Sequence, residues 1–410
     1  MNNKSVRVFA LIWAALMIAV VSSTLTLLLS GRSLQPVGEG ALKVSQSDYD
    51  AIQRYRRLDE VRNELMTQYY QQLDEDELLL GAIRGMTSAV GDPYTFYYTP
   101  EEMRRANENS AGVYRGVGLL LQNTPDGIIE VVRVFPDTPA EQAGIRVGDW
   151  IVAVDGEFVS GDDGRTYNDA VNRIRGENGT RVTVTVLRDG QEIDFPMSRG
   201  DVNVSYINYR VLPDDIGYIS IAQFTGNAAA GFAEALEAFR AQGVKGMVID
   251  VRNNPGGLLD QVVSIADKLL PTGEIVYIKD RNDTRMDFYS DEEMYDVPLA
   301  VLVNGMSASA SEILALSVQA LDRGTVVGLT TYGKGIVQSL VSYSEDGAGM
   351  QLTTSSYYDA LDRCPQGVGV TPDIEVALEG AYIPVEPDPE SDNQLAAAIA
   401  DVKRQIGGGA

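Results

Sequence analysis

The sequence contains no histidine in its 410 residues. This absence excludes every Ser-His-Asp hydrolase, every Cys-His protease and every metalloprotease with an H-E-x-x-H motif, because each of them needs an imidazole. A hydrolase of this composition must take its base from a carboxylate, a lysine or an N-terminal amine.

Cysteine and basic residues are also scarce. Cys364 is the single cysteine, so the chain forms no intramolecular disulfide and no cysteine-rich zinc or iron–sulfur site. Lys and Arg total 33 against 58 Asp and Glu, which gives a net charge of −25. This balance argues against nucleic acid as a partner and against binding of the folded surface to anionic lipid. We expect no metal and no cofactor.

One long run without charge covers residues 8–30. A helix of that length spans the roughly 30 Å hydrocarbon layer of a bilayer. Lys4 and Arg7 precede the run, so the positive-inside rule predicts a cytoplasmic N-terminus and places the rest of the chain outside the cell membrane. A cleaved signal peptide is the alternative, but its apolar region is usually only about 7–15 residues and ends at a small-x-small site. The length favours an uncleaved single-pass anchor in the lipid bilayer.

Hydrophobic periodicity divides the rest of the chain. Residues 46–108 carry apolar side chains three and four apart, as helices do, for core or oligomer packing. Short strands with turn signals follow, and then strands that alternate with helices of about 10–15 residues, which is typical of a layered α/β core. The expected fold class is an α/β core with a mostly parallel, layered sheet, a β-rich domain, an N-terminal helical region and one transmembrane helix. The expected parts are a cytoplasmic tail (1–7), the anchor (8–30), a linker (31–45), the helical region (46–108), the β-rich domain (109–200), the α/β core (201–380) and a C-terminal tail with a helix (381–410).

The β-rich domain (109–200) is identified by its residues 135–159. They contain Ala143-Gly144-Ile145, Gly148-Asp149 and Val154-Asp155-Gly156, and the stretch resembles a bacterial-type PDZ domain. The resemblance implies that the C-terminus of a peptide adds as a strand while the amides of a Gly-rich loop hold its carboxylate. The loop would be formed by Arg115, Gly116, Val117, Gly118 and Leu119. Taken alone, these residues also fit the start of a core strand.

Three further segments carry a second resemblance. They are VIDVRNNPGG (248–257), VLVNGMSASASEILAL (301–316) and TYGKGIVQS (331–339). Together they resemble the carboxyl-terminal processing (tail-specific) serine proteases of peptidase family S41, from about Tyr49 to Ile374. The resemblance implies that the α/β core (201–380) is the catalytic core, with Ser309 as the nucleophile and Lys334 as its base. One departure is at residues 358–362, where relatives usually have a Thr-Pro-Ser-Gly-like turn.

The chemistry of a chain without histidine agrees with this pairing. A lysine with an ordinary pKa near 10.4 must lose roughly 2–3 units to act near neutrality, which requires burial away from carboxylates. Gln338, four residues after Lys334, is a neutral amide that can orient the amine. Ser309 opens a helix, so the N–H of Ala310 favours an oxyanion, and Gly256 or Gly257 would supply the second donor.

Each segment also has an ordinary interpretation. Ser309 with Glu312 forms a helix capping box, Lys334 fits a solvated loop, and residues 253–257 fit a turn. A near match to a P-loop at residues 328–334 is rejected, because Gly335 stands where Ser or Thr is needed. Two other functions remain open, an inactive homologue that serves as a PDZ scaffold and a Ser–Lys amidohydrolase with a non-peptide substrate.

The function expected from the sequence is that of a membrane-anchored endopeptidase of the cell envelope. Its substrates would be proteins or peptides with exposed C-termini, and its further partners would be other copies of the chain, in a homo-oligomer, or a regulatory protein. Arg175 follows the last helix of the PDZ region and is our candidate for a contact between that domain and the core. A solvated loop arginine is the other interpretation.

Overall fold

A computed structural model describes residues 45–123, 127–135, 137–159, 164–203, 206–379 and 388–408. The chain divides into two compact units, Met1–Gly81 and Ala82–Ala410. In the first unit, α2 (Gln46–Gln68) begins at Ser45, whose hydroxyl accepts the N–H of Asp48 at 3.1 Å. The next helix, α3, covers Glu75–Ser88.

The expectation of a transmembrane helix within this fold was wrong for the part of the chain that the structure describes. None of the helices described there is both long and apolar enough to cross a bilayer. The 23 residues of α2 would suffice in length, but acidic and basic side chains such as Asp59 and Arg62 occur along it. The predicted anchor at residues 8–30 lies outside the described residues.

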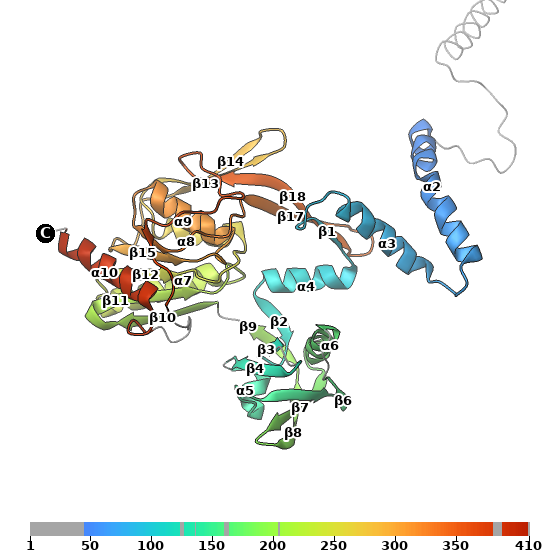
Figure 1. Cartoon of the computed structure of the whole chain (residues 1–410), viewed down its shortest axis with the longest axis horizontal. Helices are drawn as coiled ribbons and strands as arrows, with labels where there is room; N and C mark the ends of the chain where they lie inside the picture. The colour runs from blue at the N-terminus through green and yellow to red at the C-terminus, as the bar shows by residue number, and fades with distance from the viewer. Residues whose placement is uncertain are drawn as a thin grey trace, which may run out of the picture. The chain divides into compact units, whose positions relative to one another are not determined.

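A six-stranded sheet forms the centre of the second unit, in the order β10-β11-β12-β15-β16-β19 (Figure 1). β10 pairs antiparallel with β11, and the other neighbours are parallel. The sequences of β12 and β15, GMVID and LAVLV, are fully buried, as strands covered on both faces must be. The strands cover Ile207–Leu212 (β10), Ile216–Ile221 (β11), Gly246–Asp250 (β12), Leu299–Val303 (β15), Thr325–Gly328 (β16) and Ile374–Glu375 (β19).

Helices pack on both faces of this sheet. On one face, alternate strand residues such as Ile249 and Val301 join a core with α7 (Ala228–Gln242), α8 (Leu259–Asp267) and α9 (Ala310–Ala320). On the other face, residues such as Val248 and Leu302 pack against α10 (Asn393–Gly408). Because β12 and β15 are parallel neighbours, the loops after their carboxyl ends meet at one edge of the sheet.

A second, antiparallel sheet was not foreseen from the sequence. It consists of β1 (Phe96–Tyr98), β13 (Gly273–Asp280), β14 (Arg285–Ser290), β17 (Ile336–Ser342) and β18 (Gly349–Tyr358). The pairing of β1 with β18 places Phe96 opposite Gln351. A segment that precedes the PDZ region in sequence is therefore part of the catalytic core. Helix α4 (Pro100–Ser110) follows β1 and starts with a capping box of Thr99 and Glu102.

The PDZ region has its own sheet, in the order β3-β4-β5-β7-β8 with β6 on β5, and its own core around Val131, Val154 and Val184. Its strands are β3 (Leu119–Asn123), β4 (Ile129–Val134), β5 (Trp150–Val154), β6 (Glu157–Phe158), β7 (Arg181–Arg188) and β8 (Gln191–Ser198). Its helices are α5 (Pro139–Ala143) and α6 (Gly164–Ile174). A ribbon of β2 (Val113–Gly116) and β9 (Gly200–Asn203) brings the two ends of the domain together.

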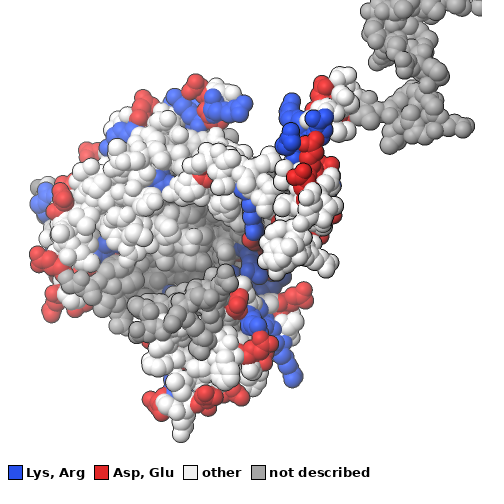
Figure 2. All heavy atoms as spheres, turned by 45° about the vertical axis from the view of Figure 1, so that its right-hand side comes forward, with Lys and Arg blue, Asp and Glu red and all other residues white. Residues whose placement is uncertain are grey.

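Charged side chains of both signs are mixed on the face drawn in Figure 2. Many are paired along the helices, as Arg104 is with Glu101 at 2.7 Å and Glu108 at 2.6 Å. Exposed pairs of this kind contribute little to stability, about 0–1 kcal/mol each.

Candidate active site

Ser309 stands between β15 and α9 in an uncommon backbone conformation. Its φ of 54° and ψ of −115° are strained for a residue with a side chain and cost about 1–3 kcal/mol. Its N–H donates to Glu312 Oε2 at 2.8 Å, which is one half of the expected capping box. The N–H of Ala310 lies in the first turn of α9 and so has no acceptor within the helix. We call this sharp turn at Ser309 the serine elbow, and it presents the Ser309 hydroxyl next to the Ala310 N–H.

The turn after β12 packs directly on this elbow. Its conformation is held by Asn254, whose amide donates to the carbonyl of Ile221 at 2.8 Å and accepts the N–H of Gly256 at 2.8 Å. Ala308 N–H donates to the carbonyl of Asn254 at 3.0 Å. A Cβ on Gly256 would lie 2.8 Å from that of Ser309, so only glycine fits.

The two glycines of this turn differ as oxyanion donors. The N–H of Gly256 is occupied by Asn254. The bridge to Phe224 uses the carbonyl of Gly256 and the N–H of Leu258, at 2.9 and 2.6 Å, and does not use the N–H of Gly257. Gly257 is therefore the better candidate of the two.

Lys334 and Ser309 line one cavity of about 520 Å³, together with Gln338, Ala310 and both glycines of the turn. Burial lowers the pKa of the Lys334 amine, while the charges of Asp92 and Glu312 oppose this shift. The ring of Tyr94 lies 4.2 Å from the Lys334 Nζ and covers it.

Gln338 is tied to the neighbouring strand of the second sheet. Its Nε2 donates to Thr353 Oγ1 at 3.2 Å, which joins β17 to β18. Gln338 thus lines the same cavity as Ser309 and Lys334, and its amide is oriented by Thr353.

Glu312 was expected only as a helix cap, and the structure gives it a second role. The side chain is fully buried, and it accepts four hydrogen bonds. Oε2 binds the N–H groups of Ser309 and Lys334, both at 2.8 Å. Oε1 binds the hydroxyl of Thr331 at 2.5 Å and the N–H of Gly333 at 2.7 Å. One carboxylate therefore holds the serine elbow against residues 331–334, which we call the lysine loop.

Tyr357 makes a second bridge between the same two segments. Its hydroxyl lies 2.7 Å from the carbonyl of Lys334 and 3.1 Å from that of Ser309. Burial raises the pKa of Tyr357 well above its ordinary value, so the phenol remains a donor. This role of Tyr357 was not predicted, because Tyr357 lies in a long strand that carries no recognisable motif.

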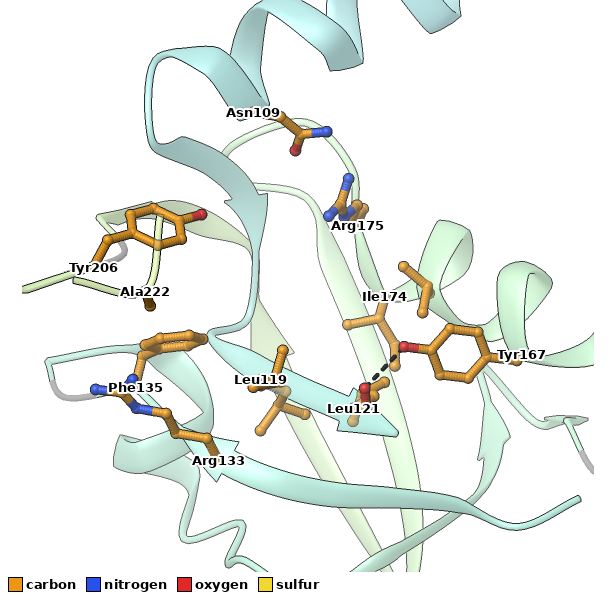
Figure 3. A pocket seen from close by; sticks show the side chains of 12 residues that line it. Asn109, Leu119, Leu121, Arg133, Phe135, Tyr167, Ile174, Arg175, Tyr206 and Ala222 are labelled. Carbon is orange, nitrogen blue, oxygen red and sulfur yellow. Dashed lines mark hydrogen bonds between the residues drawn. The ribbon is translucent and has the colours of Figure 1, made fainter. Parts of the chain in front are cut away.

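The PDZ region has a separate cavity of about 270 Å³ between β3 and α6 (Figure 3). Leu119, Leu121 and Ile174 make it apolar. Of the five predicted loop residues, Leu119 lines it. Gly116 instead pairs with Gly200 in the β2–β9 ribbon, and Val117 is buried in the domain core.

The other two loop residues have structural contacts. Arg115 forms an ion pair with Asp201 at 3.3 Å. Gly118 has a φ of +90°, and a Cβ there would lie 2.3 Å from that of Thr138.

Arg175 also lines this cavity, next to Asn109, and Tyr206 lines it beside Ala222 (Figure 3). Tyr206 belongs to the segment that leads into the catalytic core. Burial raises the pKa of Tyr206, and the positive charge of Arg175 partly offsets that effect. The contact of Arg175 between PDZ domain and core stays a prediction.

A chain with this core, this elbow and this PDZ domain has the architecture of a PDZ-containing serine peptidase. The family model "Peptidase family S41" matches residues 215–376, a PDZ domain model matches 130–188, and the model of the activating protease CtpB N-terminal domain matches 32–102. A carboxy-terminal-processing protease of Bartonella bacilliformis is 36% identical over 341 residues, which cover 81% of this chain and 77% of the relative.

A carboxy-terminal processing protease CtpA of Bacillus subtilis is 31% identical over 375 residues, or 91% of this chain and 78% of the relative. The solved structure of a photosystem II D1 C-terminal processing protease is 28% identical, with a TM-score of 0.48 over 82% of this chain and 94% of that one. The chain belongs to the carboxy-terminal processing proteases of peptidase family S41. The resemblance drawn from the sequence is thereby confirmed.

Proposed function

We propose that this serine peptidase cleaves by a Ser–Lys acyl-enzyme route. The neutral amine of Lys334 takes the proton of the Ser309 hydroxyl while its oxygen attacks the scissile carbonyl. The N–H groups of Ala310 and Gly257 receive the oxyanion. The protonated lysine then gives its proton to the leaving amine, and the acyl group stays on the serine. Water deprotonated by the same lysine releases the acid and regenerates the enzyme.

One observation carries this proposal, namely that Ser309 and a lysine with a lowered pKa line the same cavity. Ser309→Ala and Lys334→Ala should each abolish peptide cleavage, and Lys334→Arg should fail equally because a guanidinium does not give up its proton. A fluorophosphonate probe should label the wild type and not Ser309→Ala. Retention of more than a few per cent of activity by Lys334→Ala would place the base elsewhere.

The same experiments separate the two other functions. An inactive scaffold would bind tails without taking the fluorophosphonate label. A hydrolase of non-peptide amides would take the label but release no peptide fragments detectable by mass spectrometry. The PDZ domain favours protein tails over non-peptide amides, and the intact set of Ser309, Lys334 and Gln338 argues against an inactive scaffold.

We propose that protein or peptide C-termini are the substrates and that the cavity beside β3 receives them. An added strand along β3 would place alternate side chains against Leu121 and Ile174 in an apolar lining. The loop of Arg115, Gly116, Val117, Gly118 and Leu119 remains our assignment for the carboxylate, with Leu119 as the member that reaches the cavity.

We also propose that Arg175 transmits tail binding to the core, since it shares the cavity with Tyr206 and Ala222. A tail shifts the enzyme only if it binds the open and closed states with different affinities. A non-cleavable tail peptide should then accelerate cleavage of an unrelated reporter. Arg175→Ala should alter this acceleration and leave reporter cleavage without the tail unchanged.

The proposed location is outside the cytoplasm, where the enzyme would process or degrade cell-envelope proteins. The support comes from sequence alone, because a basic start followed by the uncharged residues 8–30 directs export whether or not it is later removed. Cell fractionation with protease added to intact spheroplasts tests this.

Self-association is proposed from α2, whose Tyr49, Ile52 and Tyr55 are all about half exposed.

A further inference from the structure

The C-terminal segment reaches a buried cation next to the active site. Arg252 is 1% exposed at its side chain and forms ion pairs with Asp250 of β12 at 2.6 Å and with Asp392 at 2.7 Å. A second Arg252 nitrogen, Nη1, donates to Asp392 Oδ1 and to Gln394 Oε1, both at 3.0 Å. Asp392 and Gln394 lie beyond residues 215–376, the part that matches the S41 family model. We call this buried cluster the Arg252 clamp.

The clamp uses every side of the guanidinium. Asp250 takes the Nε edge at 3.0 Å, and Asp392 accepts two parallel bonds from the terminal nitrogens. Tyr218 donates to Asp250 at 2.8 Å. Such bidentate, charge-assisted bonds fix the plane of the guanidinium as well as its position.

The position of Arg252 in the chain makes the clamp relevant to catalysis. Arg252 directly precedes the turn of residues 253–257, which contains the proposed oxyanion donor Gly257. Asn254 of this turn accepts the N–H of Ala308, the residue before Ser309. Arg252 is therefore connected through this turn both to Gly257 and to the serine elbow.

The clamp is anchored on its far side by helix α10. Asp392 accepts the N–H of Leu395 at 3.0 Å in the first turn of that helix. Gln394 donates to the carbonyl of Val376 at 2.7 Å, close to the last strand of the central sheet. Leu395 and Val402 then pack on the sheet. The acceptors of Arg252 are thus fixed by a packed helix.

We propose that Asp392 and Gln394 are positioning residues, which hold the oxyanion turn in register with Ser309 by way of Arg252. The inference rests on the proposed Ser–Lys function. It assigns a catalytic consequence to a C-terminal helix that touches none of the reacting atoms. A displaced donor stabilises the transition state less and leaves substrate binding nearly unaffected, so the effect belongs in kcat.

The test compares Asp392→Asn and Gln394→Met with the matched control Lys403→Met in the full chain. Lys403 also ties α10 to the core, through an exposed ion pair with Asp214, but it does not contact Arg252. We expect kcat of Asp392→Asn to fall about 10- to 100-fold, with KM within about threefold. Gln394→Met, which removes one acceptor of Arg252 and the bond to Val376, should show a smaller loss of the same kind. Lys403→Met should match the wild type.

A peptide aldehyde provides the readout that a purely structural role would not move. Its adduct with Ser309 places an oxyanion in the same hole, so its inhibition constant should rise in parallel with the loss of kcat. If Asp392→Asn is too unstable to purify, Gln394→Met decides the question. Equal aldehyde affinity and kcat in a folded variant would overturn the inference, and so would an equal loss in Lys403→Met. Failure of the wild type to cleave or to form the adduct would instead refute the proposed function.

Discussion

Replacement of Glu312 by glutamine should impair catalysis even though Glu312 is not expected to exchange a proton with substrate. The carboxylate accepts four hydrogen bonds, two on each oxygen. An amide keeps one accepting oxygen and puts an NH₂ donor in place of the other. The mildest outcome puts the NH₂ at the Oε1 position, where the Thr331 hydroxyl can turn to accept from it. The N–H of Gly333 then has no acceptor.

The size of the effect follows from that single lost bond. A hydrogen bond to a charged group contributes about 1.5–3 kcal/mol, and tenfold in rate corresponds to about 1.4 kcal/mol. Glu312→Gln should therefore lower kcat/KM by roughly 10- to 100-fold, provided that the strain falls on the serine elbow and the lysine loop. The opposite orientation of the amide would instead leave Ser309 and Lys334 without their acceptor, with a larger loss.

The assay is steady-state cleavage of a short reporter peptide, with the thermal midpoint measured on the same samples. Ser317→Ala is the control, since Ser317 is also buried in α9 but its hydroxyl donates to the carbonyl of Leu314, within the same helix, at 3.0 Å. A folded Glu312→Gln enzyme within twofold of the wild-type kcat/KM would refute the reasoning. A lowered midpoint with unchanged kcat/KM would reduce Glu312 to a stabilising residue.

Three further results are expected. Activity should rise with pH through the lowered pKa of Lys334 and level off below the ordinary lysine value, because the neutral amine is the active form; a flat profile between about pH 6 and 9 would contradict a lysine base. An amidated tail peptide should bind more weakly than the free acid in a titration, because amidation removes the negative charge that the N–H groups of the PDZ loop would hold. Equal affinities would mean that the loop does not bind the carboxylate. Gly256→Ala should remove most activity in the reporter assay, because its Cβ would lie 2.7 Å from the carbonyl oxygen of Ala308, and an active variant would mean that the turn can move.

The sequence was sufficient for the parts of the site that are local in the chain. Ser309 and residues 253–257 directly follow two buried strands, whose apolar runs were visible in the sequence. Two parallel neighbours place their following loops at one edge, so a motif after each strand predicts one shared site. Lys334 came from the resemblance to family S41, and the absence of histidine agreed with it without singling it out.

Pairings between distant strands could not be predicted in the same way. Thr95 accepts the N–H of Thr353 at 3.1 Å across 258 residues of sequence. No periodicity in either segment specifies the partner, because strands of one hydrophobic pattern can pair with many others. The wall of the lysine site built by Asp92 and Tyr94 was missed for this reason. The stripe of Tyr49, Ile52 and Tyr55 was expected to serve core or oligomer packing, and in the structure these side chains remain exposed.

The surroundings of Lys334 differ from those expected of a lysine base. Burial away from carboxylates was expected, yet Asp92 and Glu312 both act on the amine. Desolvation raises the pKa of Asp92, but hydrogen bonds from Thr353, Thr95 and the Tyr94 N–H outweigh it, so the carboxylate stays charged. Glu312 directs its oxygens to four donors, among them the backbone N–H of Lys334 itself.

Both carboxylates are therefore engaged by other groups, and neither forms an ion pair with Lys334 Nζ within 4.0 Å among the described residues. Their field acts on the amine from a distance, while burial under Tyr94 acts on it directly, and burial prevails. A lysine base therefore does not require that carboxylates be absent from its surroundings. Each nearby carboxylate must have enough donors of its own that it does not bind the amine.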